Sequence, residues 1–250
     1  MRTAWRGIVV PLALLVCWEV AAALGSIPLS LSRPSDVIMA GAAALSDGSL
    51  LVVTAETLQA SLLGLFLATL IGVGLGIAFG LFPVVHGVIG PTLEVLRPIP
   101  PVAFIPLALL VFGFGAPLEV SIVAFASVWP ILIVTIAAVR SVEPRLIEVA
   151  RGLELSLLQR IRLIIVPAIA PRVGVGFRIA AGISLVVAIT VEIVLNPRGL
   201  GFGIIVAQQK LQADIMYALI LWTGTVGLLF NSLVLWIERR WLPSTERGTG

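Results

Sequence analysis

The sequence predicts an all-α integral membrane protein with about six transmembrane helices. Of the 250 residues, 59% are hydrophobic and only 12% are charged, whereas a soluble domain has about half apolar and about a quarter charged residues. The mean hydropathy is +1.14. Six apolar runs are close to or longer than the length of about 20 residues that a spanning helix needs. They are continuous rather than alternating, which excludes a transmembrane β-barrel.

The six runs cover residues 8–24, 57–82, 88–113, 118–139, 173–195 and 215–237. We expect a single transmembrane domain over residues 1–250, with its core at 57–237. The segment 140–171 separates the fourth run from the fifth and carries an unusual share of the charge. It is too polar to cross a membrane, so we expect it to lie outside the bilayer.

The first run needs to be distinguished from a cleaved leader. It follows Arg2 and Arg6, as the apolar region of a signal peptide does. Trp18 and Glu19 interrupt it where such a region is uniformly apolar. We therefore expect an uncleaved first span. Cys17 is the only cysteine, which excludes an intramolecular disulfide and a cysteine-based metal site.

Positively charged residues predict the orientation of the spans. Twelve of the sixteen Lys and Arg residues lie in the N-terminal tail, between residues 140 and 178, or after the sixth run. With six spans these regions share one side, and the other side holds only Arg33, Arg198 and Lys210. Cytoplasmic loops carry the excess of Lys and Arg, so we expect both termini and the segment 140–171 in the cytoplasm. This asymmetry also accounts for the net charge of +3, and we expect no nucleic-acid partner.

The second run contains the glycine-rich stretch GVGLGIAFG. A dinucleotide-binding loop is one interpretation, but no strand precedes the stretch and the loop would lie inside hydrocarbon. Gly72, Gly76 and Gly80 are spaced four residues apart, which places them on one face of a helix. Such a stripe of small residues lets another helix approach closely. We expect these three glycines to mediate helix packing.

The third run opens with a proline cluster, LRPIPPVAFIP. Each proline removes a backbone donor and disfavours helix at the residue before it. Two interpretations stay open. The run is either a broken helix beside a solute pathway, or an interfacial segment followed by an ordinary helix that starts near Val102. The candidates for the pathway are Pro98, Pro100 and Pro101.

A few polar residues lie in or beside the apolar runs. Glu192, near the end of the fifth run, is the best intramembrane acid, because an acid at this depth is costly. It either gates the pathway or holds the following turn by bonding Arg198 or backbone donors. Asn231 in the sixth run makes an interhelical hydrogen bond or contacts the solute. Glu94 and Arg97 are three residues apart and are expected to pair at the interface.

The segment 140–171 predicts two short amphipathic helices. The first is expected over residues 145–153, with Pro144 in its first turn and Ser141 or Glu143 as its cap. Its amphipathic character leaves two roles open. The hairpin lies on anionic lipid, or it docks a cytoplasmic partner.

The second helix of this hairpin has a clear start. Ser156 is followed three residues later by Gln159, which is the pattern of a capping box. Apolar residues then recur at helical spacing. Pro167 and Pro171 are expected to end this helix before the fifth span.

The chain lacks the parts of an enzyme or an ATPase. A P-loop needs a Gly-Lys-Ser/Thr core, and the only lysine, Lys210, lies in AQQKLQA. The only histidine, His86, excludes a two-histidine zinc motif. We expect no catalytic, cofactor-binding or metal-binding residue. If ATP drives transport, another chain must bind it. A secondary transporter driven by an ion gradient is the alternative, but it would show several intramembrane acids or an inverted repeat.

The stretch EVARGLELSLLQRIRLIIVP resembles the signature loop of ABC-importer permeases, E-A-A-x-x-x-G-x9-I-x-L-P. Glu148, Ala150, Ile164 and Pro167 fall in register. Glu154 stands where the family has the glycine that allows the turn between the two helices. The stretches RPSDV, LRPIPPVAFIPLALLVFGFG and VRSVEPRLIEVA are similar to permeases of the nitrate, sulfonate and taurine importer group. The resemblance covers about residues 33–205. Gly152 lies two residues before Glu154 and is the candidate to supply the turn.

This resemblance implies a type I ABC-importer permease that forms a path for a nitrate-like, sulfonate-like or taurine-like solute. It implies a permease dimer, here a homodimer, in lipid of the bacterial inner membrane, with cytoplasmic ATP-binding subunits that hold ATP and magnesium. A periplasmic or lipoprotein solute-binding protein delivers the solute. The loop 148–167 couples the permease to the ATPase. The coupling residues implied are Glu148, Ala150, Arg151, Gly152, Ile164 and Pro167.

Overall fold

The computed structural model describes residues 4–24 and 31–241, and the regular elements in these ranges are all helical. In chain order they are α1 (Ala4–Ala23), α2 (Pro34–Ser46), α3 (Ser49–Leu81), α4 (Pro83–Leu96), the 3-10 helix η1 (Pro101–Phe104), α5 (Ile105–Phe112), α6 (Ala116–Arg140), α7 (Pro144–Gly152), α8 (Leu157–Arg160), the π-helical segment η2 (Ile161–Ile165), α9 (Val166–Val194), α10 (Gly199–Gln209) and α11 (Ala213–Trp241).

Four of the expected spans are confirmed as long helices. The second, fourth, fifth and sixth apolar runs fall in α3, α6, α9 and α11, and each of these helices is long and apolar enough to cross a membrane. The first run coincides with α1. Several side chains in the first half of α1 lie outside the described residues.

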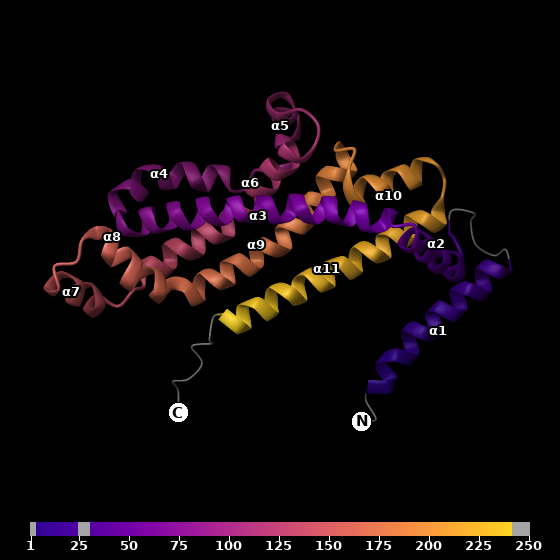
Figure 1. Cartoon of the computed structure of the whole chain (residues 1–250), viewed down its shortest axis with the longest axis horizontal. Helices are drawn as coiled ribbons and strands as arrows, with labels where there is room; N and C mark the ends of the chain where they lie inside the picture. The colour runs from indigo at the N-terminus through magenta and orange to yellow at the C-terminus, as the bar shows by residue number, and fades with distance from the viewer. Residues whose placement is uncertain (1–3, 25–30, 242–250) are drawn as a thin grey trace. The chain divides into compact units, whose positions relative to one another are not determined.

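The third apolar run, 88–113, forms a broken helix, which is one of the two alternatives that its proline cluster left open. The chain forms α4, breaks at residues 97–100, and continues through η1 into α5, and the two halves are bent by 91°. Figure 1 shows α5 turned away from the direction of α4. Pro98, Pro100 and Pro101 have no N–H to continue the helical ladder, and each restricts the residue before it. The proline cluster therefore ends α4 and reorients the chain.

The described chain divides into two compact units. One consists of residues 1–57 and 192–226, and the other of residues 58–191 and 227–250. The long helices α3, α9 and α11 each contribute residues to both units. The expected single domain over 1–250 stays a prediction.

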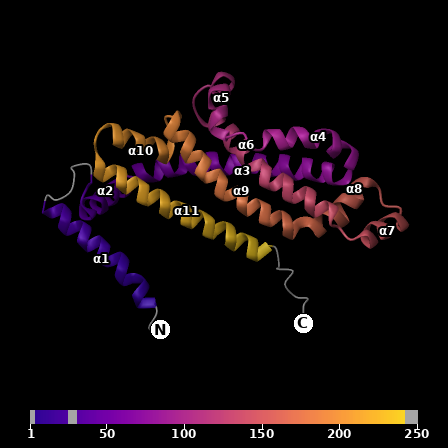
Figure 2. The ribbon, with the colours of Figure 1, turned by 180° about the vertical axis from the view of Figure 1, so that it is seen from behind.

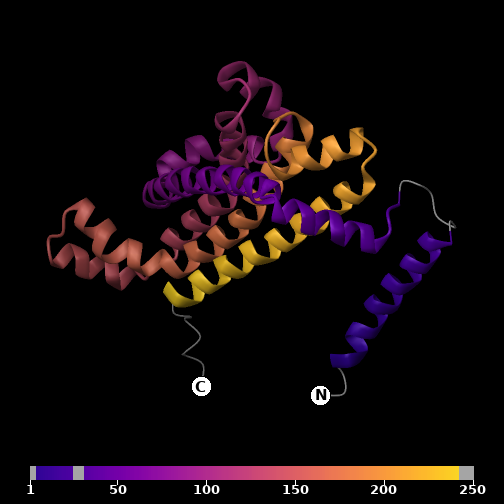
Figure 3. The same cartoon turned by 45° about the vertical axis from the view of Figure 1, so that its right-hand side comes forward.

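The first unit is held together around the beginning of α11. Gly41 of α2 lies against Ala218, with 3.6 Å between an added Cβ and the alanine Cβ. The Trp222 indole N–H donates to Thr54 Oγ1 over 2.8 Å, which ties α11 to α3. Figure 3 shows α10 running beside this part of α11.

The second unit is built on three closely packed helices, α3, α6 and α9, which Figure 2 shows side by side from behind. Small residues allow the close approach, since Ala68, Ala180 and Ala181 are almost fully buried in the same cluster as Ile131. A buried hydrogen bond of 2.9 Å joins the hydroxyls of Ser61 and Ser184. Many large apolar side chains remain exposed on the outside, such as Leu228 at 72%, as expected of a lipid-facing surface.

Candidate functional site

The segment 140–171 forms a helical hairpin beyond the ends of α6 and α9 (Figure 1). Its first helix, α7, begins at Pro144, close to the expected start. The expected caps are wrong. Glu143 occupies the N-cap position but makes no side-chain cap hydrogen bond. The Ser141 hydroxyl instead donates to the Ala138 carbonyl over 2.9 Å and accepts from Arg172, so it fastens the end of α6 to α9.

The second helix starts with the expected capping box, and both of its hydrogen bonds are present. The Gln159 N–H donates to Ser156 Oγ over 3.4 Å, and the Ser156 N–H donates to Gln159 Oε1 over 2.9 Å. Two backbone donors that would lack partners at the helix start are thereby satisfied. We expected this helix to end at Pro167 and Pro171, and that prediction is wrong. The helix continues through η2 into α9.

The π-helical turn η2 accounts for this continuity. The Val166 N–H donates to the carbonyl of Ile161, five residues earlier. A proline lacks an N–H and its ring crowds the carbonyl four residues before it, which for Pro167 is Leu163, inside η2. Because the wider turn shifts the carbonyls out of the four-residue register, the chain passes Pro167 without leaving the helix. The second helix of the hairpin is consequently continuous with α9.

The turn between the two helices is made by Glu154. Its φ is +51°, the left-handed conformation that glycine adopts most readily. The Glu154 N–H donates to the Arg151 carbonyl over 2.9 Å, and the Leu155 N–H donates to the Ala150 carbonyl over 3.0 Å. These bonds form a Schellman motif, with Glu154 at the position usually held by glycine. Gly152, the candidate for this role, is the last residue of α7 and has no positive φ.

Glu154→Gly is expected to stabilise the hairpin. A left-handed conformation costs an L-residue about 1–2 kcal/mol, and glycine removes this cost. Glycine also makes the unfolded chain more flexible, and this greater loss of entropy on folding offsets about half of the gain in stability. Hydrogen exchange should show the amides of residues 153–156 protected about threefold more than in the wild type. Gly152→Ala is the matched variant and should leave this protection equal or higher, since an alanine there meets no atom within 4 Å. Loss of protection in Gly152→Ala would contradict the assignment of the turn to Glu154.

The coupling residues expected from the sequence divide by exposure. Ala150 is fully buried within the hairpin, and Ile164 is half-buried. These two side chains pack inside the hairpin and not on its outer surface. The others are exposed to a potential partner: Glu148, Arg151, Gly152 and Pro167.

Exposed leucines surround the turn of the hairpin. Leu153 is 66% exposed, Leu157 is 50% and Leu158 is 73%. Together with the exposed charges of Glu148 and Arg151, they form a mixed surface at the tip. The sequence shows that these residues are apolar. That they lie exposed around the turn depends on the conformation of Glu154, which the sequence did not indicate.

Glu192 is 1% exposed and lies in a hydrogen-bonded cluster at the end of α9. Its Oε1 accepts from the Thr57 hydroxyl over 2.7 Å, and its Oε2 accepts from the Gly201 N–H over 2.8 Å. The Thr57 hydroxyl oxygen also accepts from the Leu200 N–H over 2.9 Å. The carboxylate therefore holds the start of α10 against α3. This geometry matches the turn-holding alternative for Glu192.

The sequence offered Arg198 as one possible partner of Glu192, but Arg198 pairs with a different acid. It forms an ion pair of 3.1 Å with Glu56, which also accepts from the Gly199 N–H over 3.0 Å. Glu56 was missed because it precedes the second apolar run and no local pattern links it to residues more than 140 positions later. Glu119, 2% exposed at the start of α6, is a second buried acid that the sequence did not single out.

Two further predicted interactions are absent from the part of the chain that the structure describes. Asn231 is exposed on α11, and its side chain makes no hydrogen bond to another described residue. Glu94 and Arg97 are likewise not joined by an ion pair among the described residues. Three residues of separation allow such a pair, but rotamers and neighbours determine whether it forms.

The glycine stripe of α3 lies against α6. A Cβ added to Gly76 would lie 2.5 Å from the Thr135 Cβ, and one added to Gly80 would lie 2.5 Å from the Val139 Cβ. At Gly72 the Ile131 Cγ2 would be 2.9 Å away. Gly64 extends the stripe at the same multiple of four residues, with Val123 Cγ1 at 2.4 Å. The sequence contains that signal, but it lies outside the glycine-rich stretch.

Comparison with known protein families identifies the family of this chain. The family described as "Binding-protein-dependent transport system inner membrane component" matches residues 60–243, more than half of the chain. The chain belongs to this family. It is the permease subunit of an ABC importer, located in the inner membrane with several spans, and not a secondary transporter. The family works with ATP-binding and solute-binding partners.

Curated relatives resemble the permease over most of its length. The taurine transport system permease protein TauC of Escherichia coli strain K12 is 32% identical over 92% of this permease and 86% of TauC. The bicarbonate transport system permease protein CmpB of Synechococcus elongatus is 33% identical over 94% of this permease and 91% of CmpB. The nitrate import permease protein NrtB of Leptolyngbya laminosa is 31% identical, with 81% and 72% covered.

A solved structure supports the same fold. The inward-facing MetNI methionine ABC transporter matches with a TM-score of 0.65 and 17% identity, over 74% of this permease and 92% of the compared chain. At this identity the match concerns the fold alone. It supports the type I permease fold that the sequence predicted.

Proposed function

We propose that the permease forms the membrane path for a small anionic or zwitterionic solute, such as a sulfonate, taurine, nitrate or bicarbonate. The relatives above are named for these solutes. All four carry an anionic oxygen group, so the shared chemistry supports an oxyanion more strongly than any single compound. A solute-binding protein, periplasmic or lipid-anchored, delivers the solute.

The observation that carries the coupling part of the proposal is the exposed hairpin tip. Glu148, Arg151 and the three leucines of the tip are exposed on a hairpin whose second helix is continuous with α9. Such a mixed surface suits a protein cleft, where apolar anchors and charged pairs are both used. We propose that the segment 148–167 docks on an ATP-binding subunit, which binds ATP and magnesium and hydrolyses the nucleotide. A push on the hairpin would reach α9 directly through the continuous helix.

The proposed assembly follows from this docking. Both termini and the hairpin lie in the cytoplasm, and two copies of the permease form a homodimer in the lipid bilayer. The bend at Pro98, Pro100 and Pro101 and the buried Glu192 remain candidates for the solute path or its gate, and the exposed Asn231 for a solute contact or an intersubunit contact. Gly72, Gly76 and Gly80 serve helix packing.

Glu148→Arg tests the docking. The permease is co-expressed with the ATP-binding subunit from its neighbouring genes, and the ratio of the two chains after purification through a permease tag is measured. Reversing an interfacial charge costs several kcal/mol, so the ratio is expected to fall at least about tenfold. Glu143→Arg is the matched control, because Glu143 is also exposed but lies outside the 148–167 loop. Equal ratios for wild type and Glu148→Arg would refute docking through this surface.

A further inference from the structure

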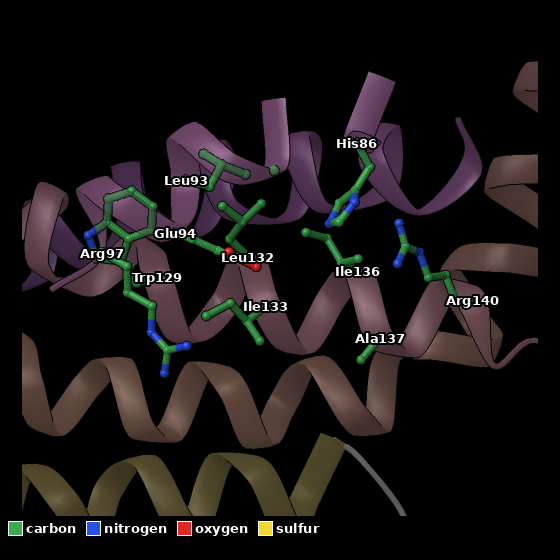
Figure 4. Close-up of a pocket in the computed structure, with 11 residues that line it drawn as sticks. His86, Leu93, Glu94, Arg97, Trp129, Leu132, Ile133, Ile136, Ala137 and Arg140 are labelled. Carbon is green, nitrogen blue, oxygen red and sulfur yellow. The ribbon is translucent and has the colours of Figure 1, made fainter. Parts of the chain in front are cut away.

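A cavity of about 420 Å³ lies between α4 and α6 and belongs neither to the hairpin nor to the Glu192 cluster. Its polar lining comes from His86 and Glu94 of α4, from Arg97 directly after this helix, and from Trp129 and Arg140 of α6. Its volume falls within the range of about 300–1,000 Å³ typical of small-molecule sites. Apolar side chains of α6, including Leu132 and Ile136, form its floor (Figure 4). We call this space the α4–α6 cleft.

The charge of the cleft favours an anion. Two arginines line it against one glutamate. Neither arginine forms an ion pair with a described residue. The side chain of Arg97 makes no hydrogen bond to the described chain, and that of Arg140 makes one long contact of 3.5 Å to the Phe79 carbonyl. Guanidinium groups with unused donors are suited to bind planar or tetrahedral oxyanions.

An indole in the wall of the cleft also lacks an acceptor. The Trp129 Nε1 is buried and makes no hydrogen bond within the described residues. Buried donors are nearly always paired, but this nitrogen is covered by protein and does not face the open cleft. Figure 4 shows Trp129 at the same end of the cleft as Arg97, with His86 and Arg140 at the other end. An oxygen acceptor at the Arg97 end would therefore meet the guanidinium, and the indole would have to turn before its N–H could contribute.

Glu94 lies between the two ends of the cleft (Figure 4). It is three residues, or about 5 Å along the helix axis, from Arg97. A carboxylate at this spacing disfavours a large polyanion that would fill the whole cleft. It leaves room for a single oxyanion group, and it would attract an ammonium group carried on the same molecule.

We infer that the α4–α6 cleft binds one small oxyanion group, with Arg97 at the primary contact and Arg140 as a second source of positive charge. The group belongs either to a free solute or to an anionic lipid headgroup, since both present the same oxygens. The step from binding to transit of the solute rests on the proposed function. Binding to the isolated permease does not, because it requires no ATP-binding subunit.

The test uses the full-length permease in nanodiscs of phosphatidylcholine and sodium ethanesulfonate as the probe. Titration calorimetry is expected to show saturable binding to the wild type, weakened at least tenfold in Arg97→Gln and less in Arg140→Gln. Arg145→Gln is the control, because this exposed arginine lies on α7 and does not line the cleft. All three arginines are exposed, so the variants should fold. Size-exclusion chromatography checks this.

A second arm distinguishes the two sources of the oxyanion. The permease is purified from membranes containing phosphatidylglycerol, and retained lipid is measured by native mass spectrometry. Retention that is lost in Arg97→Gln but kept in Arg145→Gln, without ethanesulfonate binding, would assign the cleft to a lipid headgroup. Ethanesulfonate binding without such retention would assign it to a solute. If neither probe binds, or both bind all variants equally, the inference is wrong. Normal association with the ATP-binding subunit would leave the proposed function standing in that case.

Discussion

Gly199→Ala is expected to destabilise the permease by at least about 3 kcal/mol, because two costs combine at this residue. Gly199 has a φ of +81°, where an L-residue loses about 1–2 kcal/mol. An added Cβ would also lie 1.9 Å from the Glu192 Oε1. The carboxylate would have to move and give up buried hydrogen bonds from Thr57 and Gly201, each costing about 1–3 kcal/mol when a buried partner is left unpaired.

Thermal unfolding of the purified permease in detergent measures this effect. For a chain of this size the loss corresponds to a decrease in Tm of roughly 10 °C. Gly182→Ala is the matched control, because Gly182 lies on α9, has no positive φ, and an added Cβ meets no atom within 4 Å. Its Tm should stay equal or rise, since alanine favours helix. Equal Tm values for Gly199→Ala and the wild type would contradict the stabilising role of the hydrogen-bonded cluster around Glu192.

Gly76→Leu is expected to separate α3 from α6. A Cβ alone would lie 2.5 Å from the Thr135 Cβ and 3.2 Å from the Leu132 carbonyl oxygen, and leucine adds three more carbons beyond it. Overpacking typically costs about 1–3 kcal/mol and more where nothing can give. Backbone lies on the opposing side here, so we expect a loss at or above the upper end of this range.

Gly74→Leu provides the comparison for this effect. Gly74 lies on the same helix two residues earlier, is exposed, and has no neighbouring atom within 4 Å of an added Cβ. The monodisperse fraction after size-exclusion chromatography and the Tm should both fall for Gly76→Leu and stay unchanged for Gly74→Leu. A similar outcome for the two leucine variants would show that the stripe does not mediate close packing.

The hairpin illustrates how far local patterns reach. The capping box at Ser156 and Gln159 was predictable because both of its bonds form between residues three positions apart. The turn at Glu154 was not, because glutamate gives no signal for a left-handed conformation. The end of the second helix was predicted wrongly. Proline usually stops a helix, and the π-helical turn that lets the chain pass Pro167 depends on a hydrogen-bond register that composition does not reveal.

The α4–α5 bend shows the same limit for membrane spans. The proline cluster predicted a break, because each proline removes a donor wherever it lies. The angle of 91° between the two halves was not predictable. It depends on how η1 and α5 pack, as in the tilted contact of Phe104 with Phe125, whose ring centroids are 4.5 Å apart.

Hydropathy, charge placement and signature residues were sufficient to predict a helical membrane permease, its long helices and its hairpin, since these properties depend on local composition and spacing. The partners of Glu192 and Arg198, the turn at Glu154 and the α4–α6 cleft depended on the folded chain. Thr57 and Glu192 are 135 residues apart, yet their side chains lie 2.7 Å from each other. A buried polar group must be paired, but which distant group pairs with it is set only when the helices pack.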